Sequence, residues 1–437
     1  MASAVIISVI VMSLLSLFRI NVILAIIAAG VTAGVISGLS FTDSISLLVD
    51  GMGGQANTAL SYIVLGAFAA AISYTGITNI LVSTLIRVLK GKRATLLLII
   101  AGIASLSQNV IPVHIAFIPI LIPPLLKLFD EMKIDRRAVA TALTFGLKAP
   151  YIMIPLGYGL IFHQTIQKAM AQSGTELSIN EIALSLLLPG SGMIVGLLIA
   201  IFITYRKDRV IQTSDLNFEP IKINADNKKS TKMELSHWLT LVAIVAALVV
   251  QVVTENLILS ALTGLILMFI LFVVPIKRGD SLMTEGVAMM GTIAFVMLVA
   301  SGYAHILTET GSINQLVESS SEIIGDNKIM VAFVLLLVGL LITMGIGSSF
   351  GTIPIITALY VPICLAAGFS PMAIAALIGT AGALGDAGSP ASDSTLGPTS
   401  GLNADGKHHH IWDTCVPTFI HFNIPLFIFG WIAAIIL

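Results

Sequence analysis

Residues 371–400 read PMAIAALIGTAGALGDAGSPASDSTLGPTS, an apolar segment of membrane-spanning length that is interrupted in its middle. The interruption runs from Gly385 to Thr395 and holds glycines, a proline, several hydroxyl groups and the two acids Asp386 and Asp393. A continuous helix is not expected there, because glycine and proline weaken or break the helical hydrogen-bond ladder. We therefore predict an unwound membrane crossing that contains two carboxylates.

The composition of the whole chain agrees with a membrane location. Of 437 residues, 57% are hydrophobic and 10% are charged, whereas a soluble domain is about 25% charged. Lys and Arg number 22 and Asp and Glu number 23, so no surplus of positive charge is present to neutralise phosphates. These values exclude a soluble one-domain enzyme, a disordered chain and an electrostatic nucleic-acid binder. They predict an all-α polytopic membrane protein that contacts the lipid bilayer.

Further apolar segments predict the other crossings, because a spanning helix needs roughly 20 apolar residues. The predicted spans are 3–18, 20–39, 57–75, 136–163, 182–204, 237–253, 257–275, 287–307, 371–400 and 412–436. Two longer apolar stretches, 94–126 and 329–367, carry helix breakers near their middle. We interpret both as helical hairpins, and we favour re-entrant hairpins over fully spanning ones.

Positive charge predicts the orientation, because cytoplasmic loops are rich in Lys and Arg. Basic residues flank both ends of the first hairpin, at 87–93 and 127–137. Both of its ends are therefore placed in the cytoplasm. The N-terminus then lies outside, and the charge-rich linker 206–235 lies inside.

This linker separates two halves, 1–205 and 236–437, that resemble each other. The matches, at a shift of 235 residues that later becomes 240, are Asp50-Gly51 with Glu285-Gly286, Thr75-Gly76 with Thr310-Gly311, and Pro150 with Pro390. Each half is predicted to contain about five crossings, one hairpin and one broken helix. Because five is odd, the second half would be inverted in the membrane. Inverted repeats with broken helices are typical of secondary transporters.

Three charged residues remain at membrane depth, where each costs roughly 3 kcal/mol or more to bury. Asp386 and Asp393 lie in the broken helix 371–400, and Lys148 lies in the sequence GLKAP of its counterpart 136–163. Oxygen ligands suit Na⁺, and the same carboxylates could carry H⁺, so we assign the coupling cation to Asp386, Ser389, Ser392, Asp393 and Thr395. The alternative is a helix kink whose polar groups satisfy one another.

Lys148 has three interpretations. It could form a permanent ion pair with Asp386 or Asp393, it could anchor a substrate carboxylate, or it could place a positive charge where a coupling ion sits in the other half. We assign it to substrate binding, together with Ala149, Pro150 and the hairpin tips, because small and amide side chains there should approach the broken helices. The tip residues are Ser107, Gln108 and Asn109 in the first hairpin and Gly347, Ser348 and Ser349 in the second.

The remaining polar residues do not predict a catalytic site. We find neither a nucleophile–base pair nor a set of metal ligands, so we expect no enzyme and no cofactor other than Na⁺ as a coupling ion. The tract His408, His409 and His410, beside Lys407, is interpreted as a solvated cytoplasmic loop.

The string GDAGSPASDST at 385–395 resembles the GD-x-x-SP-x-SD-T motif of the NhaC-type Na⁺/H⁺ antiporter family, part of the wider ion-transporter superfamily. In the order of its segments the chain is most similar to the amino-acid (histidine-type) permease branch. The resemblance implies that Asp386, Ser389, Ser392 and Asp393 bind cation or substrate. It also implies a bacterial inner-membrane carrier that works as a homodimer by an elevator movement.

The first half departs from a design with two carboxylate cation sites, because its broken helix carries Lys148 and no acid. This departure favours an organic substrate with a carboxylate. We therefore expect a secondary active transporter for a small carboxylate-bearing solute, with an amino acid as the favoured substrate, coupled to H⁺ or Na⁺. A Na⁺/H⁺ antiporter without an organic substrate is the alternative. A channel is less favoured, because no filter sequence repeats around an axis.

Overall fold

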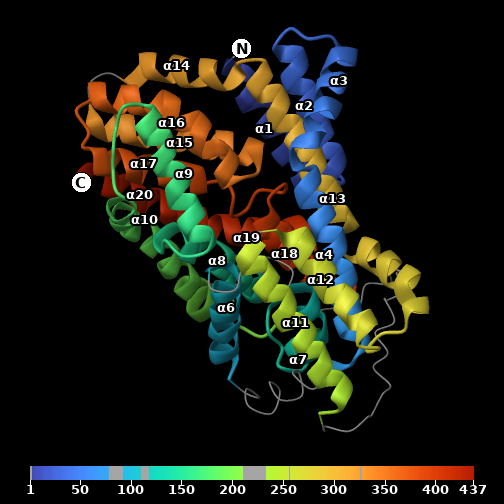
Figure 1. Cartoon of the computed structure of the whole chain (residues 1–437). Coiled ribbons are helices and arrows are strands. Elements are labelled where there is room, and N and C mark those ends of the chain that lie inside the picture. Colours follow the sequence, from blue (N-terminus) through green and yellow to red (C-terminus); the bar gives the residue numbers. More distant parts are fainter. Residues whose placement is uncertain (1, 78–91, 110–117, 210–232, 255, 325–326) are drawn as a thin grey trace.

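The computed structural model describes the chain apart from residue 1 and the segments 78–91, 110–117, 210–232, 255 and 325–326. The described residues are folded almost wholly into helices (Figure 1). The first half contains α1 (Ala2–Leu17), α2 (Val22–Ile36), α3 (Phe41–Met52), η1 (Gly53–Gln55), α4 (Ala56–Tyr74), α6 (Arg93–Asn109), α7 (Ile118–Glu131), α8 (Arg136–Met153), α9 (Tyr158–Gln172), α10 (Ile179–Ile199) and η3 (Ala200–Thr204). The second half contains α11 (Leu235–Thr254), α12 (Leu257–Ile270), η4 (Ile276–Arg278), α13 (Gly279–Glu309), α14 (Ser312–Ile324), α15 (Lys328–Ile346), α16 (Ser349–Ala366), α17 (Pro371–Ala383), α18 (Asp393–Leu402), η5 (His410–Cys415), α19 (Val416–Thr418), η6 (Phe419–Asn423) and α20 (Ile424–Ile436).

The predicted fold class is confirmed. Within the described ranges, six helical segments are long and apolar enough to cross a membrane, or seven if the bent pair α8–α9 is one span. The helices α1, α2, α12 and α17 have 16, 15, 14 and 13 residues, fewer than the roughly 20 that a crossing needs. The count of five crossings in each half therefore stays a prediction.

The second predicted hairpin is present as α15 and α16. Gly347, with φ of 71°, ends α15 in the left-handed conformation, and Ser348 caps the start of α16. The arms have 19 and 18 residues, so their length does not distinguish a re-entrant hairpin from a spanning one. In the first hairpin the arms are α6 and α7, and the connection between them lies outside the described residues.

A close helix crossing supports the internal repeat. The continuous segment α3–α4 packs against α13, which runs beside it along one side of the molecule (Figure 1). Gly51 lies against Gly302, and Gly286 lies against Ala67. A shift of 235 residues converts one of these contacts into the other, and the two helices run in opposite directions. This antiparallel contact is compatible with an inverted repeat, and the repeat itself stays a prediction.

Both predicted broken helices are interrupted, but the first one is interrupted later than its sequence indicated. In the second half, α17 ends at Ala383 and α18 begins at Asp393. In the first half, α8 continues through the GLKAP sequence to Met153, and α9 follows at an angle of 47°. Gly146 does not unwind α8. It allows close packing instead, because an added Cβ would lie 2.3 Å from Ala104 on α6.

Candidate functional site

The unwound segment between α17 and α18 is held in shape by the last helical segment. Gly385 and Gly388 have φ of 82° and 118°, conformations that favour glycine. The buried Asn423 accepts a hydrogen bond from the Gly385 N–H at 2.9 Å and donates one to the Ala387 carbonyl. His410 lies 3.0 Å from the Pro390 carbonyl. The backbone groups freed by the break therefore find partners inside the protein, as a membrane location demands.

Gly388 supplies a test of this geometry. A Cβ at this position would lie 2.6 Å from the Phe419 Cβ and 2.8 Å from the Phe419 Cα, besides occupying an unfavourable φ. Gly388→Ala should therefore cost about 1–3 kcal/mol of stability, measured as a lower midpoint of thermal unfolding in detergent. Gly102→Ala in α6 is the control, because nothing lies within 4 Å of its added Cβ. Equal midpoints for the two variants would contradict the strained geometry.

The centre of the site is an ion pair between the two halves of the chain. Lys148 of α8 donates to the Asp386 carboxylate, and both side chains are buried, with 7% and 1% exposed. Ser349, at the tip of the second hairpin, and Ser392 also donate to Asp386. Tyr151 completes the cluster, since its hydroxyl lies 2.9 Å from the Ser349 Oγ and 3.4 Å from the Lys148 Nζ. Asp386 is therefore held by three donors.

Asp393 has a more open position than Asp386. Its side chain is 21% exposed, and its Oδ1 lies 3.8 Å from the Lys148 Nζ. Tyr62 of α4 and Tyr158 of α9 interact electrostatically with this carboxylate. Side chains from three helices, α4, α8 and α9, thus surround Asp393, which is the more accessible acid of the pair.

Other predicted site residues hold the backbone of the break. The Ser389 hydroxyl donates to the Met344 carbonyl at 3.3 Å, and the Thr395 hydroxyl donates to the Ser389 carbonyl at 2.6 Å. Gly347 packs against Ala391, so the hairpin tip contacts the break directly. Ala149 and Pro150 are buried in α8 beside Lys148. The side chains of Ser107, Gln108 and Asn109 lie outside the described residues.

Two helix N-termini point into this region. α16 begins at Ser349 with Ser348 as its cap, and α18 begins at Asp393 with Ser392 as its cap. The first turns of helices present unpaired N–H groups and the positive end of the helix dipole. These ends favour the carboxylates of the protein, and they would favour a substrate carboxylate in the same way.

A cavity of about 650 Å³ leads to the hairpin tip from the side of α3 and α13. Asp50 and His305 line its wall, and Ser348 and Phe350 line it at the tip. The Phe350 ring lies 5.8 Å from the ring of Tyr151, which belongs to the Lys148 cluster. The residues Ser348 to Phe350 therefore separate the cavity from the charged cluster.

The prediction of a solvated histidine tract is wrong. His408 is 3% exposed, and its Nε2 lies 2.7 Å from the Thr414 hydroxyl. Burial lowers the pKa of His408 to about 3, because the charged form would be desolvated. His410 also bonds inward, to Thr399 as well as to Pro390. The loop folds back between α18 and the last helix, where threonine hydroxyls offer partners to the imidazoles.

Sequence reasoning missed three residues of the site. Asn423 was detectable as an amide within an otherwise apolar final span. Tyr62 and Tyr151 gave no comparable signal, because an aromatic residue in an apolar helix is ordinarily a packing residue.

Interrupted helices and a hairpin tip gather a few buried charges, and a cavity reaches the other side of that tip. This arrangement is typical of membrane transporters. The chain belongs to the Na⁺/H⁺ antiporter family. One model described as "Na+/H+ antiporter family" matches residues 142–431, and one described as "Na+-H+ antiporter family" matches residues 3–89.

Relatives match over essentially the full length. The chain is 47% identical to a Bacillus subtilis protein named "Putative amino acid transporter YuiF", with 100% of both chains covered. It is 49% identical to "Uncharacterized membrane protein VP2115" of Vibrio parahaemolyticus, with 99% of both covered. Among solved structures, the YdaH transporter of Alcanivorax borkumensis is similar at 13% identity and a TM-score of 0.46, with 90% of this chain and 87% of that chain covered.

Proposed function

We propose that the protein is a secondary active transporter that moves an amino acid together with H⁺ or Na⁺. The observation that carries the proposal is the net charge of the site. One positive side chain, Lys148, lies close to two carboxylates, Asp386 and Asp393, so the three residues together carry one excess negative charge. An uncompensated charge in a low-dielectric site is costly, so the site favours uptake of one further cation. That cation is the coupling ion.

The same charges suit the two ends of an amino acid. Asp393, the more exposed acid, would receive the ammonium group. The substrate carboxylate would bind near the N-termini of α16 and α18 and would also pair with the ammonium group of Lys148. Because Asp386 already occupies Lys148, neutralisation of Asp386 by a cation would release the lysine to the substrate. Cation and solute would then bind best together, which is the requirement for symport.

The cavity beside Asp50 and His305 supplies a route to the site in this proposal. Movement of the Ser348 to Phe350 tip would open that route to the Lys148 cluster. An elevator movement, a homodimer in the inner membrane, an external N-terminus and a cytoplasmic 206–235 linker complete the proposal. The name of the 47% identical Bacillus subtilis relative supports an amino acid as solute.

Transport by reconstituted protein tests the proposal. Liposomes with purified protein should accumulate one or more amino acids when an inward H⁺ or Na⁺ gradient is imposed, and liposomes without protein should not. Dissipation of the gradient by an ionophore should stop the accumulation. If no amino acid moves and Na⁺ alone collapses a proton gradient, the protein is instead a Na⁺/H⁺ antiporter without an organic substrate.

A further inference from the structure

A second hollow, of about 300 Å³, lies at the end of the molecule predicted to face the cytoplasm, away from the charged cluster. It is formed by the start of α6, the turn between α7 and α8, and the end of the α10–η3 segment. Four basic side chains line it: Arg93, Lys133, Arg206 and Lys207. No acid is among the ten described residues that line it.

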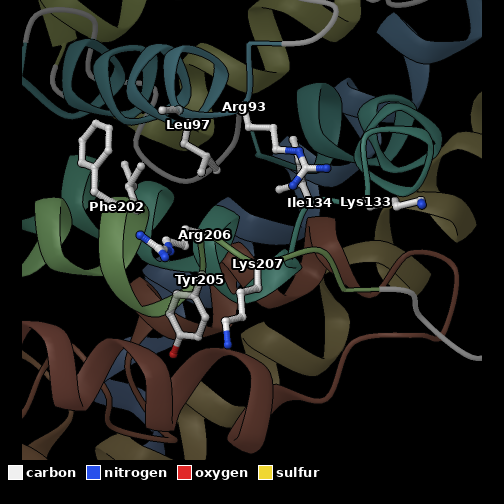
Figure 2. A pocket seen from close by; sticks show the side chains of 10 residues that line it. Arg93, Leu97, Lys133, Ile134, Phe202, Tyr205, Arg206 and Lys207 are labelled. Carbon is white, nitrogen blue, oxygen red and sulfur yellow. The ribbon is translucent and has the colours of Figure 1, made fainter.

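One side of this basic pocket is apolar. Figure 2 shows Phe202 and Leu97 together on one side and Arg93 and Lys133 on the other. Phe202 is 48% exposed, whereas Leu97 is 3% exposed, so the apolar side extends from the interior to the protein surface. A site with a cationic half and an apolar half that reaches the surface suits an amphipathic ligand.

Asp208 compensates part of the positive charge of the pocket: it pairs with Arg93 at 2.5 Å and also interacts electrostatically with Lys133. Lys133, Arg206 and Lys207 have no ion pair with the part of the chain that the structure describes. α6 begins at Arg93, so the positive end of its dipole lies at the same place.

We propose that this pocket binds the phosphate headgroup of an anionic membrane lipid. Guanidinium groups pair with phosphate oxygens through two parallel hydrogen bonds, which assigns Arg93 and Arg206 to the phosphate. Lys133 and Lys207 attract the phosphate at longer range through their flexible side chains. The first acyl carbons of the lipid lie against Phe202, at the level where a helix leaves the bilayer. Basic pockets between transmembrane helices on this side recognise such headgroups.

Thermal unfolding of the purified full-length protein in detergent tests the proposal. Phosphatidylglycerol added to the micelles should raise the midpoint by a few degrees, because a ligand that binds only the folded state stabilises it. Phosphatidylcholine, which has no net charge, should raise it much less. Arg206→Gln and Arg93→Gln should each lose most of the phosphatidylglycerol effect. Lys168→Gln and Lys277→Gln, which remove exposed basic residues elsewhere, should keep it.

Native mass spectrometry of the same protein gives a second readout that does not depend on the variants. The wild-type protein should retain phosphatidylglycerol in preference to phosphatidylcholine from an equal mixture. Equal retention and equal stabilisation by the two lipids would overturn the proposal. The proposal would also be overturned if Lys168→Gln and Lys277→Gln lost as much of the phosphatidylglycerol effect as the Arg93 and Arg206 variants. If sodium phosphate alone reproduced the shift, the ligand would be free phosphate and the lipid assignment would be wrong.

Discussion

Asp393→Asn should strongly reduce cation-driven amino-acid uptake while the protein stays folded. The substitution removes the one excess negative charge of the site, so the substrate ammonium group loses its partner and the site attracts a coupling cation less strongly. A charge-assisted bond is worth about 1.5–3 kcal/mol, and each 1.4 kcal/mol is tenfold, so uptake should fall between about 10-fold and 100-fold. Folding should survive, because Asp393 is 21% exposed and the main partner of Lys148 is Asp386.

The measurement is initial uptake in liposomes at fixed gradients, with unfolding midpoints recorded on the same preparations. Asp280→Asn is the matched control, since Asp280 is also an acid in the first turn of a helix but is exposed and distant from the cluster. It should transport like the wild type. Wild-type uptake by Asp393→Asn would remove Asp393 from the site and leave the excess-charge argument without support.

The sequence was sufficient to predict the composition of the charged cluster. Only three charged residues (Asp, Glu, Lys or Arg) were left over once the loops had been assigned, and the repeat placed Lys148 opposite the second break. Burial is costly, so charges that cannot reach water must find one another, and Lys148 and Asp386 do. The contact between the second hairpin tip and the break was predicted in the same way, and Ser349 at that tip bonds to Asp386.

The sequence was not sufficient where the outcome depends on a neighbouring helix. Glycine at 146 is a possible breaker when α8 is considered alone, yet its role is to admit Ala104 of α6. Asn423 bonds to backbone groups at Gly385 and Ala387, and no local pattern connects these positions. The loop at His408 seemed solvated for the same reason, since its burial depends on threonines from two different helices.

Breaking the Lys148–Asp386 pair should have the largest effect on stability. Lys148→Met leaves Asp386 as a buried carboxylate with two hydroxyl donors but no cation in direct contact, and Asp386→Asn leaves Lys148 with only the more distant Asp393. Loss of one partner of a buried pair costs about 3–5 kcal/mol, so each single variant should unfold at much lower denaturant concentration in mixed micelles. Neither should transport.

The double variant Lys148→Met with Asp386→Asn separates the structural role from the functional one. It restores the charge of the site to the wild-type value. Ser349 and Ser392 bond to different oxygens of Asp386, so an asparagine can accept from one serine through its oxygen and donate to the other through its amide nitrogen. Most of the lost stability should therefore return, because no unpaired charge is left buried at these two positions. Uptake should stay absent, because the lysine that would pair with the substrate carboxylate is gone. If the double variant regained both stability and uptake, Lys148 would be a structural residue only, and the substrate carboxylate would have to depend on the helix N-termini alone.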